Sequence, residues 1–257
     1  MVIDAKNGRL KAWVALEKKD NGFAEAKLLK KAFSARSIAL INVPALLTGI
    51  DASLEDSIDI CGGVYDTEDG LKIRDHNGST KGYGLIPVRD ALVKKSNVAM
   101  YKIMQIAMGN ESASGLWQKI MRRTDATNAM NIAASMWNIY NDEAIIYPTL
   151  KGDSVEVVSH TETKPKERQY IKEVLIGLNK ADGIQTAYAP QDVEIAGVYG
   201  NWGKDYYTND NTVTETSFAG FLRRKLALHL FFLTVISRYK STGPRCHSLV
   251  LSTSNLL

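Results

Sequence analysis

The sequence predicts an α+β fold, in which an antiparallel sheet formed from both chain ends is covered by helices. Three observations lead to this prediction. Strand-like segments that can pair as a hairpin occupy residues 2–16, apolar residues recur at helical spacing through the middle of the chain, and a second pair of strand-like segments follows at residues 193–222. No internal repeat interrupts this order.

The first half of the chain contains the clearest local signals. Asn7-Gly8 lies between two strand-like runs, which is typical of a tight β-hairpin. We expect a helix over residues 23–47, broken near residues 34–37. The polar, glycine-rich residues 61–84 predict loops and a short hairpin. Apolar residues at helical spacing in residues 88–108 predict two buried helices with a turn at residues 94–96.

The second half predicts further helices and then strands. Residues 112–123 and 126–140 have helical patterns, and Pro165 precedes an amphipathic helix over residues 166–179. Residues 193–199 and 212–222 are expected to pair as a hairpin. The N-terminal hairpin and these strands are then available to build one sheet.

Composition excludes several classes of protein. Of the 257 residues, 45% are hydrophobic and 23% are charged, which is typical of a soluble globular protein and not of a disordered, collagenous or disulfide-scaffold chain. The longest apolar run, residues 226–236, is too short for a bilayer span of roughly 20 residues. The histidines lack metal-ligand spacing, so a zinc site is not expected. No cofactor is expected either.

The formal charge of +4 is unevenly distributed. Residues 222–257 contain six basic residues and no acidic one, whereas the first 221 residues have a net charge of −2. Because the whole excess lies in this tail, the basicity does not indicate a nucleic-acid partner.

Five segments, in matching order and spacing, resemble the transpeptidase domain of bacterial penicillin-binding proteins. Residues 2–12 resemble its first hairpin, and residues 33–37 fall where the family has Phe-x-Pro-Gly-Ser. Residues 91–100 resemble the helix–turn–helix with the second motif. Residues 129–148 resemble a helix that ends in Ala-Asn-Gly-Gly and a proline, and residues 195–221 resemble the third motif and the next strand. The resemblance covers about residues 1–221.

The resemblance implies a serine acyl-transferase. The family acylates a serine with a D-Ala-D-Ala stem peptide or a β-lactam and then cross-links it, using Ser-x-x-Lys, Ser-x-Asn and Lys-Thr-Gly. A serine hydroxyl is a weak nucleophile unless a neighbouring base takes its proton. Lysine three residues later on a helix lies one turn away on the same face. Backbone N–H groups would stabilise the tetrahedral intermediate.

The sequence departs from the family pattern at every motif. Ser37 occupies the nucleophile position, but Leu40 replaces the lysine that acts as general base. In the second motif Lys95 replaces the first serine and is followed by Ser96 and Asn97. The substrate-binding Lys-Thr-Gly position reads Val198, Tyr199, Gly200. Because removal of a positioned base costs about 10²–10⁴ in rate, we expect an inactive or strongly impaired transpeptidase.

Two alternatives follow for activity. The amine of Lys95 can stand in for the missing base, or it is a solvated charge at the start of a helix. The whole chain is then either an impaired enzyme or a catalytically dead pseudoenzyme that binds peptidoglycan or a partner.

The resemblance also implies partners and a location. A peptidoglycan stem peptide or a β-lactam is the expected ligand, division or elongation proteins are candidate partners, and nucleic acid is not expected. The expected location is extracytoplasmic, at the periplasmic face of the inner membrane. The family's membrane anchor and pedestal are not found in this sequence, so we expect a fragment that begins at the first strand of the domain.

The tail has two interpretations. We expect residues 1–221 to form the transpeptidase-like domain and residues 222–257 to be a divergent basic tail. Its reading frame is shifted from near Phe221, or it is a divergent ending in which residues 226–236 supply the last core strand.

Overall fold

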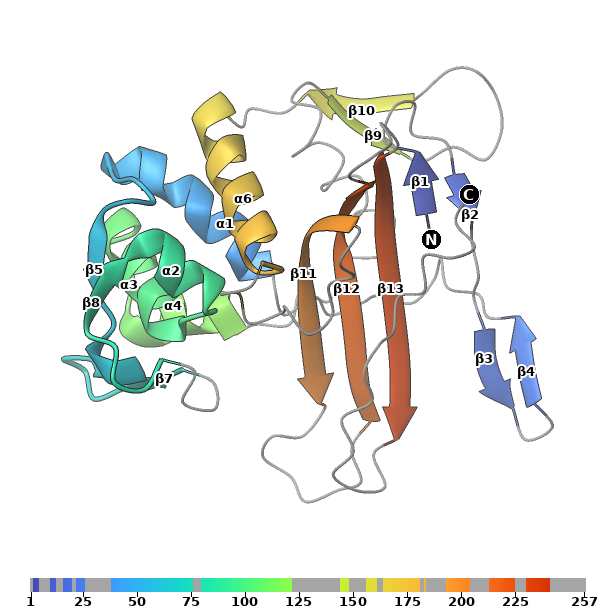
Figure 1. The fold of residues 1–257 in the computed structure, drawn as a ribbon. Helices are drawn as coiled ribbons and strands as arrows, with labels where there is room; N and C mark the ends of the chain where they lie inside the picture. The colour runs from blue at the N-terminus through green and yellow to red at the C-terminus, as the bar shows by residue number, and fades with distance from the viewer. Residues whose placement is uncertain are drawn as a thin grey trace.

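A computed structural model shows how the chain is arranged. It describes residues 2–4, 10–12, 16–19, 22–25, 38–75, 80–121, 144–147, 156–160, 164–180, 183, 193–203, 213–224 and 230–240. A group of helices lies beside an antiparallel sheet (Figure 1), so the chain is α+β, as predicted.

The main sheet has five strands in the order β11-β12-β13-β1-β2, and all neighbours are antiparallel. Its strands are β1 (Val2–Asp4), β2 (Leu10–Ala12), β11 (Val193–Gly203), β12 (Val213–Arg224) and β13 (Leu230–Lys240). Strand β1 lies between β2 and β13. The predicted hairpins, β1–β2 and β11–β12, are therefore confirmed, and both chain ends contribute to one sheet.

The boundary expected at residue 221 falls inside β12, which remains paired with β11 as far as Arg224. Strand β13 then pairs with β12 from Leu230 to Lys240. Residues 230–240 thus form an interior strand, the role that the divergent-ending interpretation gives to this region. The shifted-frame interpretation stays a prediction, and residues 225–229 and 241–257 lie outside the described residues.

The helix expected to start at residue 23 is wrong at its beginning. Strands β3 (Leu16–Lys19) and β4 (Gly22–Glu25) pair there as an antiparallel hairpin, and the first helix starts at Ile38. The sequence Asp20-Asn21-Gly22 is rich in turn residues, and Gly22 has φ 127°, which glycine adopts most readily. Turn chemistry therefore prevails over the helical pattern. Residues 26–37 are not among those described.

The helices form one group (Figure 1). They are α1 (Ile38–Leu46), the 3₁₀ helix η2 (Leu47–Ile50), α2 (Val88–Val93), α3 (Asn97–Ala107), α4 (Ala113–Met121) and α6 (Pro165–Gly177). The predicted pair of helices in residues 88–108, with its break at residues 94–96, is confirmed. The helix expected at residues 126–140 lies outside the described residues.

Short strand pairs flank the helices and the sheet. They are β5 (Ser57–Asp59) with β8 (Leu85–Pro87), β6 (Val64–Asp66) with β7 (Lys72–Arg74), and β9 (Ala144–Tyr147) with β10 (Glu156–His160). A 3₁₀ turn, η3 (Cys61–Gly63), precedes β6. The pair β6–β7 confirms the short hairpin expected within residues 61–84.

Helix α6 connects the helical group to the sheet, because it contacts α1, α2 and β11. One buried cluster runs through these elements, including Leu40 on α1, Leu92 on α2, Val174 on α6 and Val198 on β11. Burial of these apolar surfaces is what holds the helical group against the sheet. Among the described residues, no helix is long and apolar enough to cross a membrane.

Candidate active site

The turn between α2 and α3 carries the residues that resemble the second motif. Lys95 has φ 56°, in the left-handed region that residues other than glycine rarely adopt. Its backbone N–H donates to the carbonyl of Leu92 at 2.9 Å, and the N–H of Ser96 donates to the carbonyl of Ala91 at 2.9 Å. These hydrogen bonds close the turn, so that α3 begins directly after it.

Ser96 is fully buried and caps α3. Its hydroxyl accepts a hydrogen bond from the N–H of Ala99 at 3.1 Å and donates to Oδ2 of Asp75 at 2.8 Å. The hydroxyl of Thr80 donates to the same oxygen, and Oδ1 of Asp75 accepts from the N–H of Val98 at 3.0 Å. The carboxylate therefore lies at the positive end of α3. We call Asp75, Thr80 and Ser96 the Asp75 clamp.

Asn97 is bound to the same loop, because its Nδ2 donates to the carbonyl of Arg74 at 2.8 Å. The two polar residues of the motif are thus both fastened to the end of β7. Sequence reasoning missed Asp75. A signal was present, since α3 has no acidic residue in its first turn and a polar loop with an aspartate precedes it in the chain.

The side chain of Lys95 is half-buried. Burial lowers the pKa of its amine from the usual 10.5 to about 7, because the charged form loses hydrating water. An amine with this pKa is neutral in about half of the molecules at pH 7. It can therefore accept a proton or attack an electrophile, which an ordinary exposed lysine does poorly at neutral pH.

Helix α1 places Leu40, the residue at the general-base position, in the core at 3% exposure. The sequence of α1 is apolar apart from one asparagine and contains no lysine. The first motif therefore presents no amine from this helix. Ser37 directly precedes α1 in the sequence and lies outside the described residues.

Strand β11 carries the positions of the third motif and forms one edge of the five-stranded sheet. The side chain of Val198 is buried at 4% exposure. Tyr199 lies opposite Phe218 and Gly200 lies opposite Ser217 in the β12 register. The strand at these positions is regular and keeps its ladder with β12.

Asn179, just after α6, fixes β11 in place. Its Nδ2 donates to the carbonyl of Gly197 at 2.9 Å and to the carbonyl of Leu175 at 2.9 Å. Asn179 is itself buried at 8% exposure. The end of α6 is therefore tied to the strand one residue before the third-motif positions.

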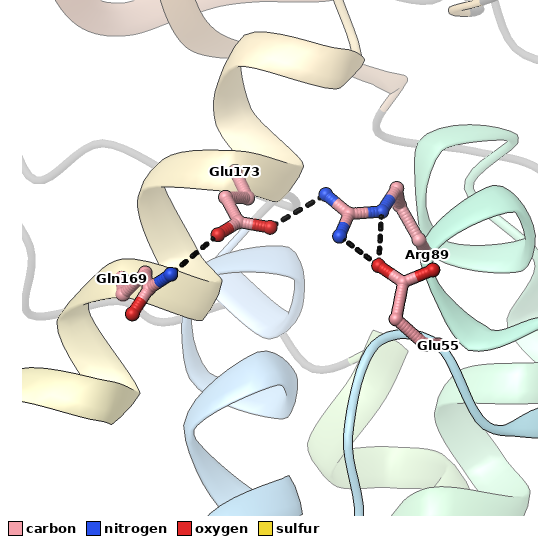
Figure 2. A network of polar contacts seen from close by, with 4 residues as sticks. All are labelled: Glu55, Arg89, Gln169 and Glu173. Carbon is pink, nitrogen blue, oxygen red and sulfur yellow. Dashed lines mark hydrogen bonds and ion pairs between the residues drawn. The ribbon is translucent and has the colours of Figure 1, made fainter.

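A polar network fastens the other side of α6 (Figure 2). Nε of Arg89, on α2, donates to Oε1 of Glu55 at 3.1 Å, and Nη1 lies 2.5 Å from Oε2 of Glu173 on α6. Nη2 also pairs with Glu55. Nε2 of Gln169 donates to the other carboxylate oxygen of Glu173 at 2.9 Å. Helix α6 thus contacts both α2, which directly precedes the second motif, and β11, which carries the positions of the third motif.

Within the described part of the chain, no group of three or more His, Cys, Asp or Glu side chains could hold a metal ion.

The solved structures that are similar to the chain over most of its length include two from Burkholderia species. One is the apo transpeptidase domain of penicillin-binding protein 3 from Burkholderia pseudomallei, with a TM-score of 0.70 and 15% identity over 91% of this chain and 78% of that one. The chain has the fold of a penicillin-binding protein transpeptidase domain. The other is a peptidoglycan glycosyltransferase from Burkholderia ambifaria, with a TM-score of 0.70 and 15% identity over 95% of this chain and 82% of that one. No family model and no curated protein matches the sequence.

The transpeptidase fold predicted from the sequence resemblance is therefore confirmed. In this fold the structure brings the second-motif residues against β7 and the third-motif strand against α6. It places the side chain of Leu40, at the general-base position, in the hydrophobic core.

Proposed function

We propose that the chain is a transpeptidase-like domain of peptidoglycan synthesis in which acylation of Ser37 is strongly impaired. The expected acyl donors are D-Ala-D-Ala stem peptides and β-lactams. The observation that carries this proposal is the burial of Leu40, because α1 then supplies no base to the serine that precedes it. A missing base lowers the rate by about 10²–10⁴.

The residual reaction uses the amine of Lys95. Ser37 Oγ forms a bond with the donor carbonyl while the neutral amine of Lys95 takes its proton. The C–N bond of the donor then breaks, and the leaving nitrogen receives the proton. The pKa of about 7 keeps part of the amine neutral at physiological pH. The backbone of residues 198–200 offers hydrogen-bonding groups to the donor along the edge of the sheet.

This function locates the protein at the extracytoplasmic face of the inner membrane, where peptidoglycan is cross-linked. Division or elongation proteins are its partners. The acyl transfer proceeds with side chains alone and uses no cofactor.

A second candidate is a binding module that retains the fold without acyl transfer. The observation that favours it is the structural use of the second motif. Ser96 is fully buried and its hydroxyl donates a hydrogen bond to Asp75. The side-chain amide of Asn97 donates to the carbonyl of Arg74. These side chains stabilise the turn by hydrogen bonds. This structural role is compatible with a module that binds peptidoglycan and does not catalyse acyl transfer.

Incubation with a fluorescent penicillin, followed by intact-protein mass measurement, tests the proposal. We expect slow labelling that is lost in Ser37→Ala and reduced at least tenfold in Lys95→Ala. Lys94→Ala is the matched control, because Lys94 lies in the same turn but stands over the ring of Tyr83 at 5.0 Å. Its labelling should equal that of the wild type.

Three results would contradict the proposal. Rapid, stoichiometric labelling argues against impairment, and labelling that survives in Ser37→Ala argues against the serine. A complete lack of label, together with binding to purified peptidoglycan in a sedimentation assay, favours the binding module.

A further inference from the structure

The last turn of α6 lies very close to the end of α2. Gly177 is the last residue of α6, and Val93 is the last residue of α2. A Cβ atom on Gly177 would lie 2.5 Å from Cγ2 of Val93, whereas an ordinary contact of a Cβ atom is 3.4–4 Å. Glycine permits this approach because it has no Cβ atom. Val93 directly precedes the turn that carries Lys95.

Neither side of this contact can move away easily. Val93 is buried, and its branched side chain has one strongly preferred rotamer in a helix. Leu178, which follows Gly177, is fully buried. Gly183 also packs on the end of α6, since a Cβ atom there would lie 2.3 Å from the carbonyl oxygens of Gly177 and Leu178. The contact therefore fixes the distance between the ends of α2 and α6.

The same end of α6 is bound to the strand that carries the third motif. The buried side chain of Asn179 donates to the carbonyl of Gly197 on β11 and to that of Leu175 on α6, at 2.9 Å each. We call residues 177–179 the α6 spacer. It contacts α2 just before the second-motif turn and β11 just before the third-motif positions. The spacer therefore sets the position of one motif relative to the other.

We propose that the α6 spacer positions the two motifs for acyl transfer, with Gly177 holding the Lys95 turn and Asn179 holding β11. This inference rests on the proposed function, in which the Lys95 amine takes the serine proton while the edge of β11 binds the donor. Both groups act on one donor molecule, so a change in their separation misplaces the donor relative to the base. A misplacement of about 1 Å can cost about 10²-fold in rate.

Alanine at position 177 changes this separation by one methyl group. In Gly177→Ala the added Cβ atom and Cγ2 of Val93 must move apart by about 1 Å to reach an ordinary contact. The full chain is labelled with a fluorescent penicillin over a range of concentrations, which gives the maximal labelling rate and the half-saturating concentration. Gly49→Ala, in the helix η2, is the matched control, because a Cβ atom there meets no atom of the described residues within 4 Å.

We expect the maximal rate to fall at least tenfold in Gly177→Ala, with the half-saturating concentration within threefold of the wild type, because β11 still binds the donor. Gly49→Ala should label like the wild type. The double variant Gly177→Ala/Val93→Ala should regain most of the rate, since Val93→Ala removes the methyl groups at the contact. A purely structural role would lower the labelled amplitude and leave the rate of the folded fraction unchanged. That result, or no recovery in the double variant, would overturn the inference.

Asn179→Ala tests the other contact of the spacer without adding volume, so it does not depend on whether Gly177→Ala folds. The bond to the Gly197 carbonyl is lost, and the maximal rate should fall at least fivefold. A wild type that labels, with Gly177→Ala and Asn179→Ala labelling equally fast, would overturn the inference and leave the proposed function in place. A wild type that takes up no label would instead overturn the proposed function, and the role in acyl transfer with it.

Amide hydrogen exchange tests the spacer without any donor. Gly177→Ala should speed exchange of the Lys95 and Ser96 amides, whose hydrogen bonds to α2 close the turn. Adding Val93→Ala should reverse this effect. Asn179→Ala should speed exchange in β11 and leave the turn unchanged. If exchange in the turn is the same in Gly177→Ala as in the wild type, the spacer does not hold the turn, and the inference fails whatever the penicillin result.

Discussion

Replacement of Lys95 by methionine should reveal the cost of burying its amine. Methionine has a similar length and a Cβ atom, so the backbone strain at this position is unchanged while the titrating amine is removed. The pKa is about 7 in the folded chain, against 10.5 for the free side chain. Between these values the unfolded chain binds more protons than the folded one, so the stability of the wild type rises with pH.

The magnitude follows from the two pKa values. The cost of keeping the amine unprotonated is fully present near pH 7 and is lost as the pH approaches 10.5. Between pH 7 and pH 9 this relief amounts to about 2 kcal/mol. Lys95→Met should therefore be more stable than the wild type at pH 7, and its advantage should shrink by this amount at pH 9.

Urea denaturation of both proteins at pH 7, 8 and 9 measures the difference in free energy of unfolding. All other titratable groups are common to both proteins, so their contributions cancel in the difference. Lys94→Met, the same substitution one residue earlier, is the matched control. A stability difference between Lys95→Met and the wild type that is constant from pH 7 to pH 9 would refute the reasoning.

Two further substitutions probe the supports of the site. Asp75→Asn should lower the free energy of unfolding by about 1–3 kcal/mol in urea denaturation, because the Ser96 hydroxyl and the start of α3 lose a charged acceptor; an unchanged midpoint would show that the clamp contributes nothing. Asn179→Ala should cost about 1–2 kcal/mol and speed amide hydrogen exchange in β11, since the bond to the Gly197 carbonyl is lost. Exchange that accelerates equally in β1 would point instead to global destabilisation.

The sequence predicted the elements whose signals are local. The break between α2 and α3 at residues 94–96 was predicted from apolar spacing. The β6–β7 hairpin was predicted from a polar, glycine-rich sequence, and the pairing of β11 with β12 from two strand-like segments. Helical and strand periodicities survive in the fold because each element buries one face. The helix predicted to begin at residue 23 was wrong over residues 23–25, because these residues belong to strand β4 of the β3–β4 hairpin.

The candidate site was less accessible to prediction. The motif positions could be read from the order of segments, and Leu40 at the base position was visible in the sequence. The role of Asp75 was not, because it depends on a carboxylate 21 residues before Ser96 that reaches the helix start only when β7 folds against α3. The link from Asn179 to Gly197 is likewise set by how α6 packs on β11.

The sequence by itself determined the α+β class, the resemblance to a transpeptidase domain and the loss of its motif residues, because these depend on residue type and order. Tertiary structure alone decided that Leu40 is a core residue and that residues 230–240 form an interior strand. It also decided the low pKa of Lys95. Burial and pairing are properties of neighbours distant in the chain, and the free energy of a charged or apolar group depends on those neighbours.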